Sequence, residues 1–136
     1  TSGTHGYGLL GRAMGPVSGY VLTSENSPTV YIMGDCKWDN NTRDVAQKYC
    51  PDYIVVNCGG AVFPELSKTD GSAIPDEQEV MAMLDELPEN VRLIAVHMDA
   101  TDHGQTTRAI LRNEAQHHKA DMSRLLIPDD GESLDL

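Results

Sequence analysis

The chain has 136 residues, the length of one ordinary domain, and 40% hydrophobic with 23% charged residues is a globular composition. Ten Lys and Arg against 21 Asp and Glu give a net charge of -11, which disfavours nucleic acid and anionic membrane surfaces as partners. The apolar runs are much shorter than the roughly 20 residues of a membrane span, so we expect none.

Three cysteines, Cys36, Cys50 and Cys58, form no CxxC pair, and their odd number cannot make a complete disulfide set. This favours a reducing, cytoplasmic compartment. Cys50 and Cys58 are interpreted as small apolar packing residues, whereas Cys36 follows Asp35 and is a candidate for the lining of a pocket. The first residues lack a secretory signal and run into a Gly-rich stretch, so we expect the chain to begin inside a larger fold.

Apolar periodicity and turn-forming residues predict the secondary structure in chain order. The expected elements are a Gly-rich loop over 1–16, strands over 17–23 and 29–33, a short helix over 42–49, a buried strand over 53–56, a loop over 57–75, a helix from Asp76 to before Pro88, a buried strand over 91–96, a helix over 106–118, and short closing strands over 125–127 and 133–136. Buried strands followed by helices are typical of the α/β or α+β class.

The sharpest local feature is an apolar strand that ends in Gly34 and Asp35. Glycine lets the backbone turn and a ligand approach closely, so Asp35 is the first candidate for chemistry. The alternative is that Asp35 starts a turn or caps the next segment, as Asp often does.

His97 is the second candidate, because the apolar run 93–96 carries it to the end of a buried strand. Asp99, Asp102 and His103 follow within the same loop, and a nearby carboxylate is what fixes the tautomer of a metal-bound imidazole. A single histidine at a strand end is more often a hydrogen-bonded structural residue.

His5 is the third candidate, since the glycine that follows it leaves room around the imidazole. By itself it would be a loop histidine. Together, His5, Asp35 and His97 provide nitrogen and oxygen ligands of the kind that suit Zn, Mn or Fe, and they leave the coordination incomplete.

Arg108 and Arg112 are four residues apart and share one face of the expected last helix. Two guanidinium groups there could grip a phosphate or a carboxylate, and the alternative is an ion pair with one of the many acidic residues. We favour the ion pair for Arg112 and leave both alternatives open for Arg108.

His117 and His118 are interpreted as solvated residues that cap a helix end. No GxSxG elbow is present, and the loop glycines match neither a GxGxxG that follows an expected strand nor GxxxxGK[ST]. The sequence therefore supports neither a serine nucleophile nor a nucleotide loop.

Five segments in this order carry a family resemblance. They are Thr4-His5-Gly6, Gly15-Pro16-Val17-Ser18-Gly19-Tyr20-Val21-Leu22, Tyr31-Ile32-Met33-Gly34-Asp35, Pro51-Asp52 before Tyr53-Ile54-Val55-Val56-Asn57, and Val96-His97-Met98-Asp99-Ala100. They resemble the C-terminal half of metallo-β-lactamase-fold hydrolases, in the branch similar to L-ascorbate-6-phosphate lactonase. The resemblance implies an αββα sandwich with the metal centre at one edge between the sheets. It also implies that His5 binds one metal ion, that Asp35 bridges two, and that His97 binds the other.

The resemblance covers nearly the whole chain, so residues 1–136 are interpreted as the C-terminal half of such a domain. The family's H-x-H-x-D-H metal motif belongs to the N-terminal half and has no match in these residues. Cys36 also stands where the family commonly has Thr. We therefore expect an exposed sheet face that pairs with the N-terminal half of the same fold or with a second copy in a homo-oligomer.

The resemblance implies a metal-dependent hydrolase whose two divalent ions, Zn or Mn with Fe as an alternative, activate water to attack a lactone, an ester or a phosphodiester. Asp35 and His97 would be the catalytic metal ligands, and Arg108 and His103 would bind a small-molecule substrate that can carry a phosphate. The isolated chain should bind metal weakly and turn over little. The alternatives are a non-catalytic binding or assembly module with a decayed metal site and, against the acidic charge, a metallo-nuclease.

Overall fold

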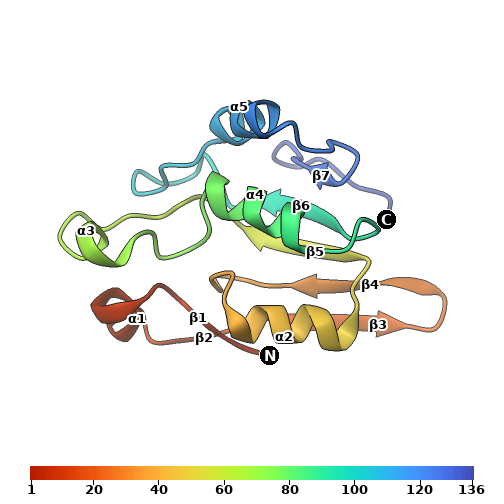
Figure 1. The fold of residues 1–136 in the computed structure, drawn as a ribbon, viewed down its shortest axis with the longest axis horizontal. Helices are drawn as coiled ribbons and strands as arrows, with labels where there is room; N and C mark the ends of the chain where they lie inside the picture. Colours follow the sequence, from red (N-terminus) through yellow and green to blue (C-terminus); the bar gives the residue numbers. More distant parts are fainter.

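A five-stranded sheet forms the centre of the computed structural model, which describes residues 1–136 (Figure 1). Its strands, in spatial order, are β3 (Tyr20–Ser24), β4 (Ser27–Ile32), β5 (Tyr53–Asn57), β6 (Arg92–Val96) and β7 (Leu125–Leu126). β3 and β4 form an antiparallel hairpin, and β4 to β7 are parallel. The carboxyl ends of β4, β5 and β6 therefore meet at one edge, on the left of Figure 1.

The first 18 residues form a small unit of their own. β1 (Ser2–Thr4) pairs antiparallel with β2 (Pro16–Ser18), and α1 (Gly8–Met14) connects them. The predicted loop over 1–16 and the single strand over 17–23 are therefore wrong. Gly19 separates β2 from β3, and a Cβ atom there would lie 2.7 Å from the Ile32 carbonyl oxygen. The glycine content of residues 1–16 indicated a loop, whereas the pairing of β1 with β2 makes both segments strands.

Three of the helices are those expected from the sequence, namely α2 (Asn40–Tyr49), α4 (Glu77–Glu86) and α5 (Arg108–His118), and the predicted long loop also contains α3 (Ser67–Asp70). Side chains cap the three longer helices. Asp39 accepts hydrogen bonds from the first turn of α2, Asp76 does so for α4, and Thr107 does so for α5. These local contacts explain why the helix starts were visible in the sequence.

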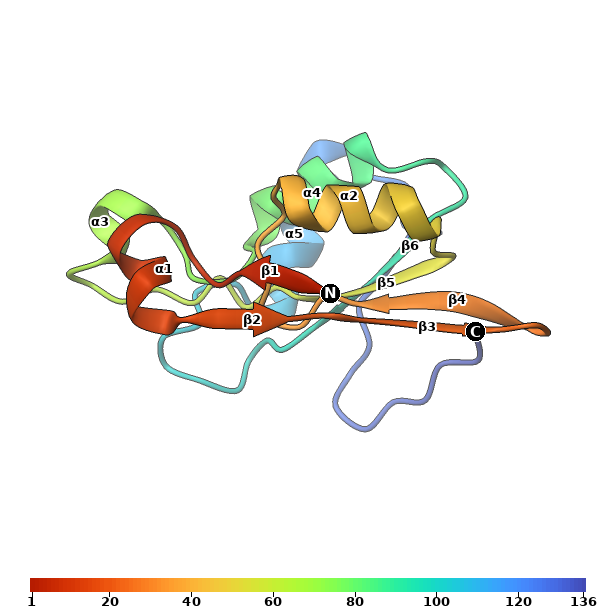
Figure 2. The same cartoon turned by 90° about the horizontal axis from the view of Figure 1, so that it is seen from below.

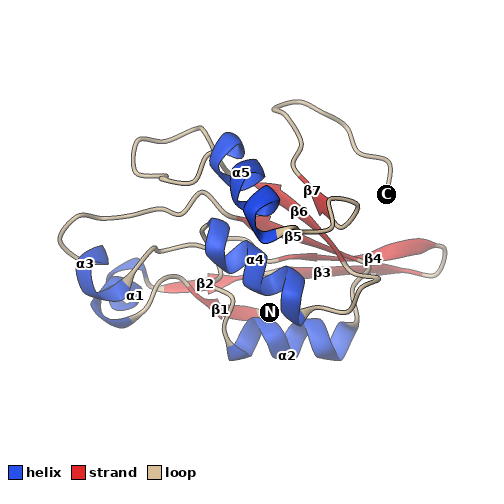
Figure 3. Ribbon diagram, turned by 45° about the horizontal axis from the view of Figure 1, so that its top comes forward, coloured by secondary structure: helices blue, strands red, loops and turns tan.

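The three longer helices, α2, α4 and α5, lie on one side of the central sheet. Figure 2 shows α2 and α4 above the sheet, and Figure 3 shows α2, α4 and α5 in sequence across it. The main core joins inward side chains of the strands, such as Ile54 and Leu93, to Val80 of α4 and Leu111 of α5. Burial of this apolar surface is the main stabilising contribution to the fold. The mixed α/β class predicted from the sequence is confirmed.

The other face of the sheet is apolar and carries no helix (Figure 2). Ile32, Val55 and Ile94 share this face because they pair directly across β4, β5 and β6. On the edge strand, Tyr20 and Leu22 are 65% and 54% exposed. The segment after β7 is irregular, so the predicted strand over 133–136 is wrong, whereas the one near 125–127 is confirmed as β7. No helix combines the length and the apolar character that crossing a bilayer requires.

Candidate functional site

The structure brings Asp35 and His97 together at the carboxyl edge of the sheet. Gly34, with φ +61°, turns the chain after β4, and His97 directly follows β6. The His97 Nε2 atom lies 4.0 Å from the Asp35 Oδ1 atom, and the two side chains are 48% and 36% exposed. An imidazole and a carboxylate therefore face each other in a solvent-accessible position.

Asn57, a residue that the sequence reasoning missed, binds the same carboxylate. It is the last residue of β5, between β4 and β6, and its Nδ2 atom donates a 2.8 Å hydrogen bond to Asp35 Oδ1. Strand alternation puts Asn57 on the helix-free face with Val55, because Ile54 and Val56 belong to the core beneath the helices. The signal available in the sequence was that Asn57 is a polar residue at the end of the buried strand β5.

The backbone at His97 is in an uncommon conformation. His97 has φ +64° and Asp99 has φ +61°, in the left-handed region that non-glycine residues seldom adopt. The His97 carbonyl packs against Gly59, where a Cβ atom would lie only 2.4 Å from that oxygen. Such strained residues cluster at functional sites, so the conformation supports a functional role for this loop.

His5 lies near this edge without joining the pair. It follows β1, and the backbone N–H of Lys37 donates a 2.8 Å hydrogen bond to the Thr4 carbonyl, so the segment before His5 lies beside the one after Asp35. However, no group of three His, Cys, Asp or Glu side chains is close enough to hold a metal ion. The structure thus assembles two of the three residues expected as ligands.

Arg108 is held by the protein itself. Its guanidinium pairs with Asp99, at 2.8 Å, and with Asp130, and it donates to the Pro128 carbonyl at 2.8 Å. The hydrogen bond to Asp99 raises the pKa of Arg108 further above its usual range. An ion pair was the alternative left open from the sequence, and a substrate phosphate would have to compete with these partners. Arg112 also faces an acidic residue, Asp129, at 3.6 Å.

His103 stacks on Phe63, with ring centroids 5.4 Å apart and an interplanar angle of 30°. The N–H of Val62 also donates to the His103 carbonyl at 2.8 Å, and Ala61 pairs with Gly104 in an isolated bridge. The loops that follow β5 and β6 are therefore joined. The role of His103 in substrate binding stays a prediction.

The cysteines differ in burial. Cys36 and Cys58 are fully buried, and burial raises the pKa of Cys36 to about 11 and that of Cys58 to about 12, so both remain protonated thiols near neutral pH. Cys50 is exposed, which contradicts its interpretation as a packing residue. It adopts a left-handed conformation at the C-cap of α2, before Pro51, and this places it at the surface.

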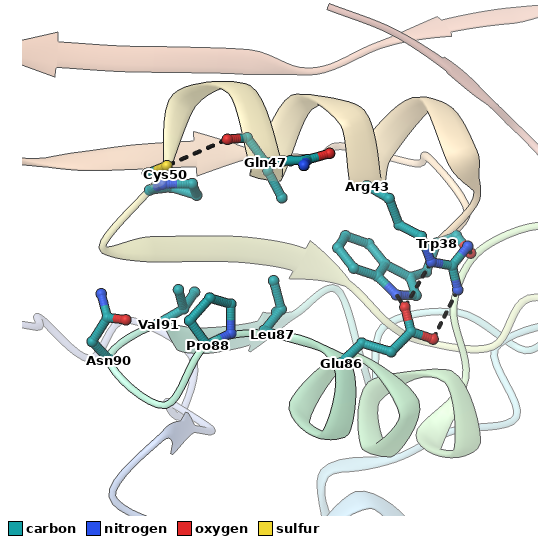
Figure 4. A pocket seen from close by; sticks show the side chains of 11 residues that line it. Trp38, Arg43, Gln47, Cys50, Glu86, Leu87, Pro88, Asn90 and Val91 are labelled. Atoms are coloured by element: carbon teal, nitrogen blue, oxygen red, sulfur yellow. Dashed lines mark hydrogen bonds and ion pairs between the residues drawn. The ribbon is translucent and has the colours of Figure 1, made fainter.

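A cavity of about 470 Å³ lies between α2 and the C-terminal end of α4 (Figure 4). Arg43 and Glu86 form an ion pair at its wall, and Trp38 donates to the same carboxylate at 2.9 Å. Neither Asp35 nor His97 lines this cavity. It is therefore separate from the candidate site.

The chain is similar to hydrolases of known structure. It superposes on a possible metal-dependent hydrolase from Veillonella parvula with a TM-score of 0.89, 27% identity, and coverage of 100% of this chain and 52% of that one. It superposes on the isothiocyanate hydrolase from Delia radicum gut bacteria with a TM-score of 0.88, 31% identity, and coverage of 99% and 53%. The chain has a metallo-hydrolase-like fold.

Among curated proteins, the UPF0173 protein YddR of Bacillus subtilis is 33% identical over 134 residues, which are 98% of this chain and 50% of that protein. The chain spans about half the length of the relatives it matches. No protein-family model matches it. The finer resemblance to the ascorbate-6-phosphate lactonase branch stays a prediction, because none of these relatives bears that name.

Proposed function

We propose that the protein is a metal-dependent hydrolase whose metal centre includes Asp35 and His97. The observation that carries this proposal is the 4.0 Å approach of the Asp35 carboxylate to the His97 imidazole at the edge where parallel strands end. Ligands in open sheets of this kind commonly bind beyond the carboxyl ends of the strands. The similarity to hydrolases of known structure supports the same activity.

The two side chains fit a divalent metal ion. Metal bonds to histidine nitrogen and carboxylate oxygen are about 2.0 to 2.2 Å, so two tetrahedral ligand atoms on one ion lie roughly 3.4 Å apart. The Asp35 and His97 side chains, 4.0 Å apart, would therefore have to approach each other by about half an ångström to hold a shared ion. The donors are a neutral nitrogen and an anionic oxygen, which suit Zn, Mn or Fe. Both side chains are partly exposed, and this leaves room for further ligands. His5 is the third proposed ligand from this chain.

A centre with two ions needs more ligands than these three residues supply. We propose that the others belong to the N-terminal half of the same fold, packed on the helix-free sheet face beside Asn57 and Val55. That face is apolar, and Tyr20 and Leu22 on its edge strand are 65% and 54% exposed, so a second sheet would bury them. Without that half, the 136 residues should bind metal weakly and show little activity.

Bound divalent ions would activate water and polarise the bond to be cleaved. In this proposal the protein's own residues hold and orient the reactants. Asp35 and His97 fix the centre, the joined loops that carry Phe63 and His103 border it, and His103 and Arg108 position a small substrate. The cleaved bond belongs to a lactone, an ester or a phosphodiester, and the net charge of -11 disfavours nucleic acid as the phosphodiester.

An isothiocyanate is a second candidate substrate. The neighbour that hydrolyses isothiocyanates has 31% identity to this chain and a TM-score of 0.88. The central carbon of an isothiocyanate is an electrophile that water attacks, as it attacks a lactone or ester carbonyl. The same two metal ligands would therefore serve either reaction, and the walls of the site would select the substrate.

Elemental analysis of the full-length protein and a panel of four substrate classes test the proposal. We expect about two equivalents of Zn, Mn or Fe, and an activity toward a lactone, an ester, a phosphodiester or an isothiocyanate that a chelator removes. Asp35→Asn and His97→Gln should lower both metal content and activity, whereas His117→Gln, in the last turn of α5, should change neither. Absence of bound metal would instead favour a non-catalytic module.

A further inference from the structure

We propose that Asn57 is a positioning residue that holds the Asp35 carboxylate in the orientation needed for metal binding. The inference rests on the proposed metal centre and adds a residue to it. Asn57 is not itself a proposed ligand. Its function would be to select one orientation of a carboxylate that is 36% exposed and would otherwise rotate.

The hydrogen bond from Asn57 leaves most of the acceptor positions of the Asp35 carboxylate free for metal binding. An ionised carboxylate has about four lone-pair positions on its two oxygens. The Asn57 amide occupies one position on Oδ1, at 2.8 Å, and the same oxygen faces His97 Nε2 at 4.0 Å. The remaining positions on Oδ1, and Oδ2, would therefore stay available to hold metal ions.

The place of Asn57 in the sheet explains why it can hold Asp35 firmly. β5 is the middle strand of the sheet, and Asn57 pairs directly with Val96, the residue before His97. Asp35, in contrast, lies in a turn after β4. The hydrogen bond therefore ties a carboxylate on a turn to the middle strand of the sheet. Partners that orient metal ligands typically change metal affinity about 10- to 100-fold when they are replaced.

The competing interpretation is that Asn57 only stabilises the turn after β4. Two variants separate the interpretations. Asn57→Leu removes the donor and keeps a side chain that branches at the same carbon. Asn57→Asp keeps the shape of the side chain and places a second carboxylate against that of Asp35. The two carboxylates should repel each other when no metal is bound, whereas the new one should provide an additional anionic ligand when metal is bound.

The experiment measures Co²⁺ and Zn²⁺ affinity, the visible Co²⁺ spectrum, and the unfolding midpoint with and without chelator, all in the full-length protein. We expect Asn57→Leu to lower metal affinity about 10- to 100-fold and to alter the Co²⁺ spectrum, with little change in the midpoint in chelator. We expect Asn57→Asp to be less stable than the wild type in chelator and to gain more from added metal than the wild type does.

Asn90→Leu and Asn90→Asp are matched controls, because Asn90 is exposed and lines the separate cavity between α2 and α4. If Asn57→Leu does not fold, Asn57→Ala replaces it. Wild-type affinity and an unchanged Co²⁺ spectrum in the Leu or Ala variant would overturn the role of Asn57 and leave the proposed function intact. A wild-type protein that binds neither ion would instead overturn the proposed function.

Discussion

Lys37 forms an ion pair with Glu79 inside the protein, across 42 residues of sequence. The Lys37 side chain is only 4% exposed, and its Nζ atom also donates to Ser72 Oγ at 3.0 Å and to the Ile74 carbonyl at 3.3 Å. Burial raises the pKa of Glu79, although the positive charge of Lys37 opposes this effect. The pair therefore ties the segment after Asp35 to the first turn of α4.

Lys37→Met should destabilise the protein by about 3 to 5 kcal/mol, because it leaves the carboxylate of Glu79 partly buried without a partner. The double variant Lys37→Met/Glu79→Leu should regain most of this loss, since apolar residues can replace a buried ion pair. Urea unfolding of the wild type and of both single and double variants measures the effect. Additive losses in the double variant would contradict the interpretation.

His97→Gly should fold at least as stably as the wild type in the presence of chelator. Glycine relieves the left-handed conformation, which costs other residues about 1 to 2 kcal/mol, and this gain offsets its own entropic cost of about 0.5 to 1 kcal/mol. His97→Val should lose about 1 to 3 kcal/mol, because a branched side chain tolerates this conformation poorly. Both variants should lose metal affinity. A clear loss of stability in His97→Gly would show that the side chain itself stabilises the fold.

Arg108→Ala tests whether this residue binds substrate or only holds the C-terminal segment. Loss of its bonds to Asp99 and Pro128 should lower the free energy of unfolding by about 1 to 2 kcal/mol. If Arg108 also binds a phosphate, the KM for phosphorylated substrates should rise, while the KM for neutral ones should not. An unchanged KM for both would remove Arg108 from the substrate site. Arg112→Ala is the control on the same helix.

Glu86→Gln should change the pH dependence of stability. The hydrogen bond from Arg43 lowers the pKa of Glu86 below its ordinary value of 4.5. The ionised Glu86 side chain therefore stabilises the folded state above pH 4.5, and this stabilisation is lost as the pH falls through the lowered pKa of the folded state. The wild type should therefore exceed the variant in stability near neutral pH, by less than about 1 kcal/mol for so exposed a pair, and the gap should close in acid. Glu89→Gln, at an exposed position, is the control for the removal of one carboxylate. Thermal unfolding between pH 3 and 7 measures both.

The sequence by itself determined the elements whose signals are local. The apolar runs of β5 and β6 and the capped starts of α2, α4 and α5 were predicted to within a few residues, because burial patterns and N-caps act over a few neighbouring positions. The positions of Asp35 and His97 at strand ends followed from the same patterns. Their nearness follows from parallel strands that share one edge.

Tertiary structure alone decided the contacts between distant segments. The pairing of β1 with β2, the bond from Asn57 to Asp35, and the partners of Arg108 join residues whose own neighbours give no sign of the contact. The glycine-rich segment before β2 was predicted to be a loop, because the hydrogen bonds that make β1 and β2 strands come from each other and not from neighbouring residues. Likewise, an asparagine at a strand end acquires a role only when the chain folds back and brings a carboxylate within hydrogen-bonding distance.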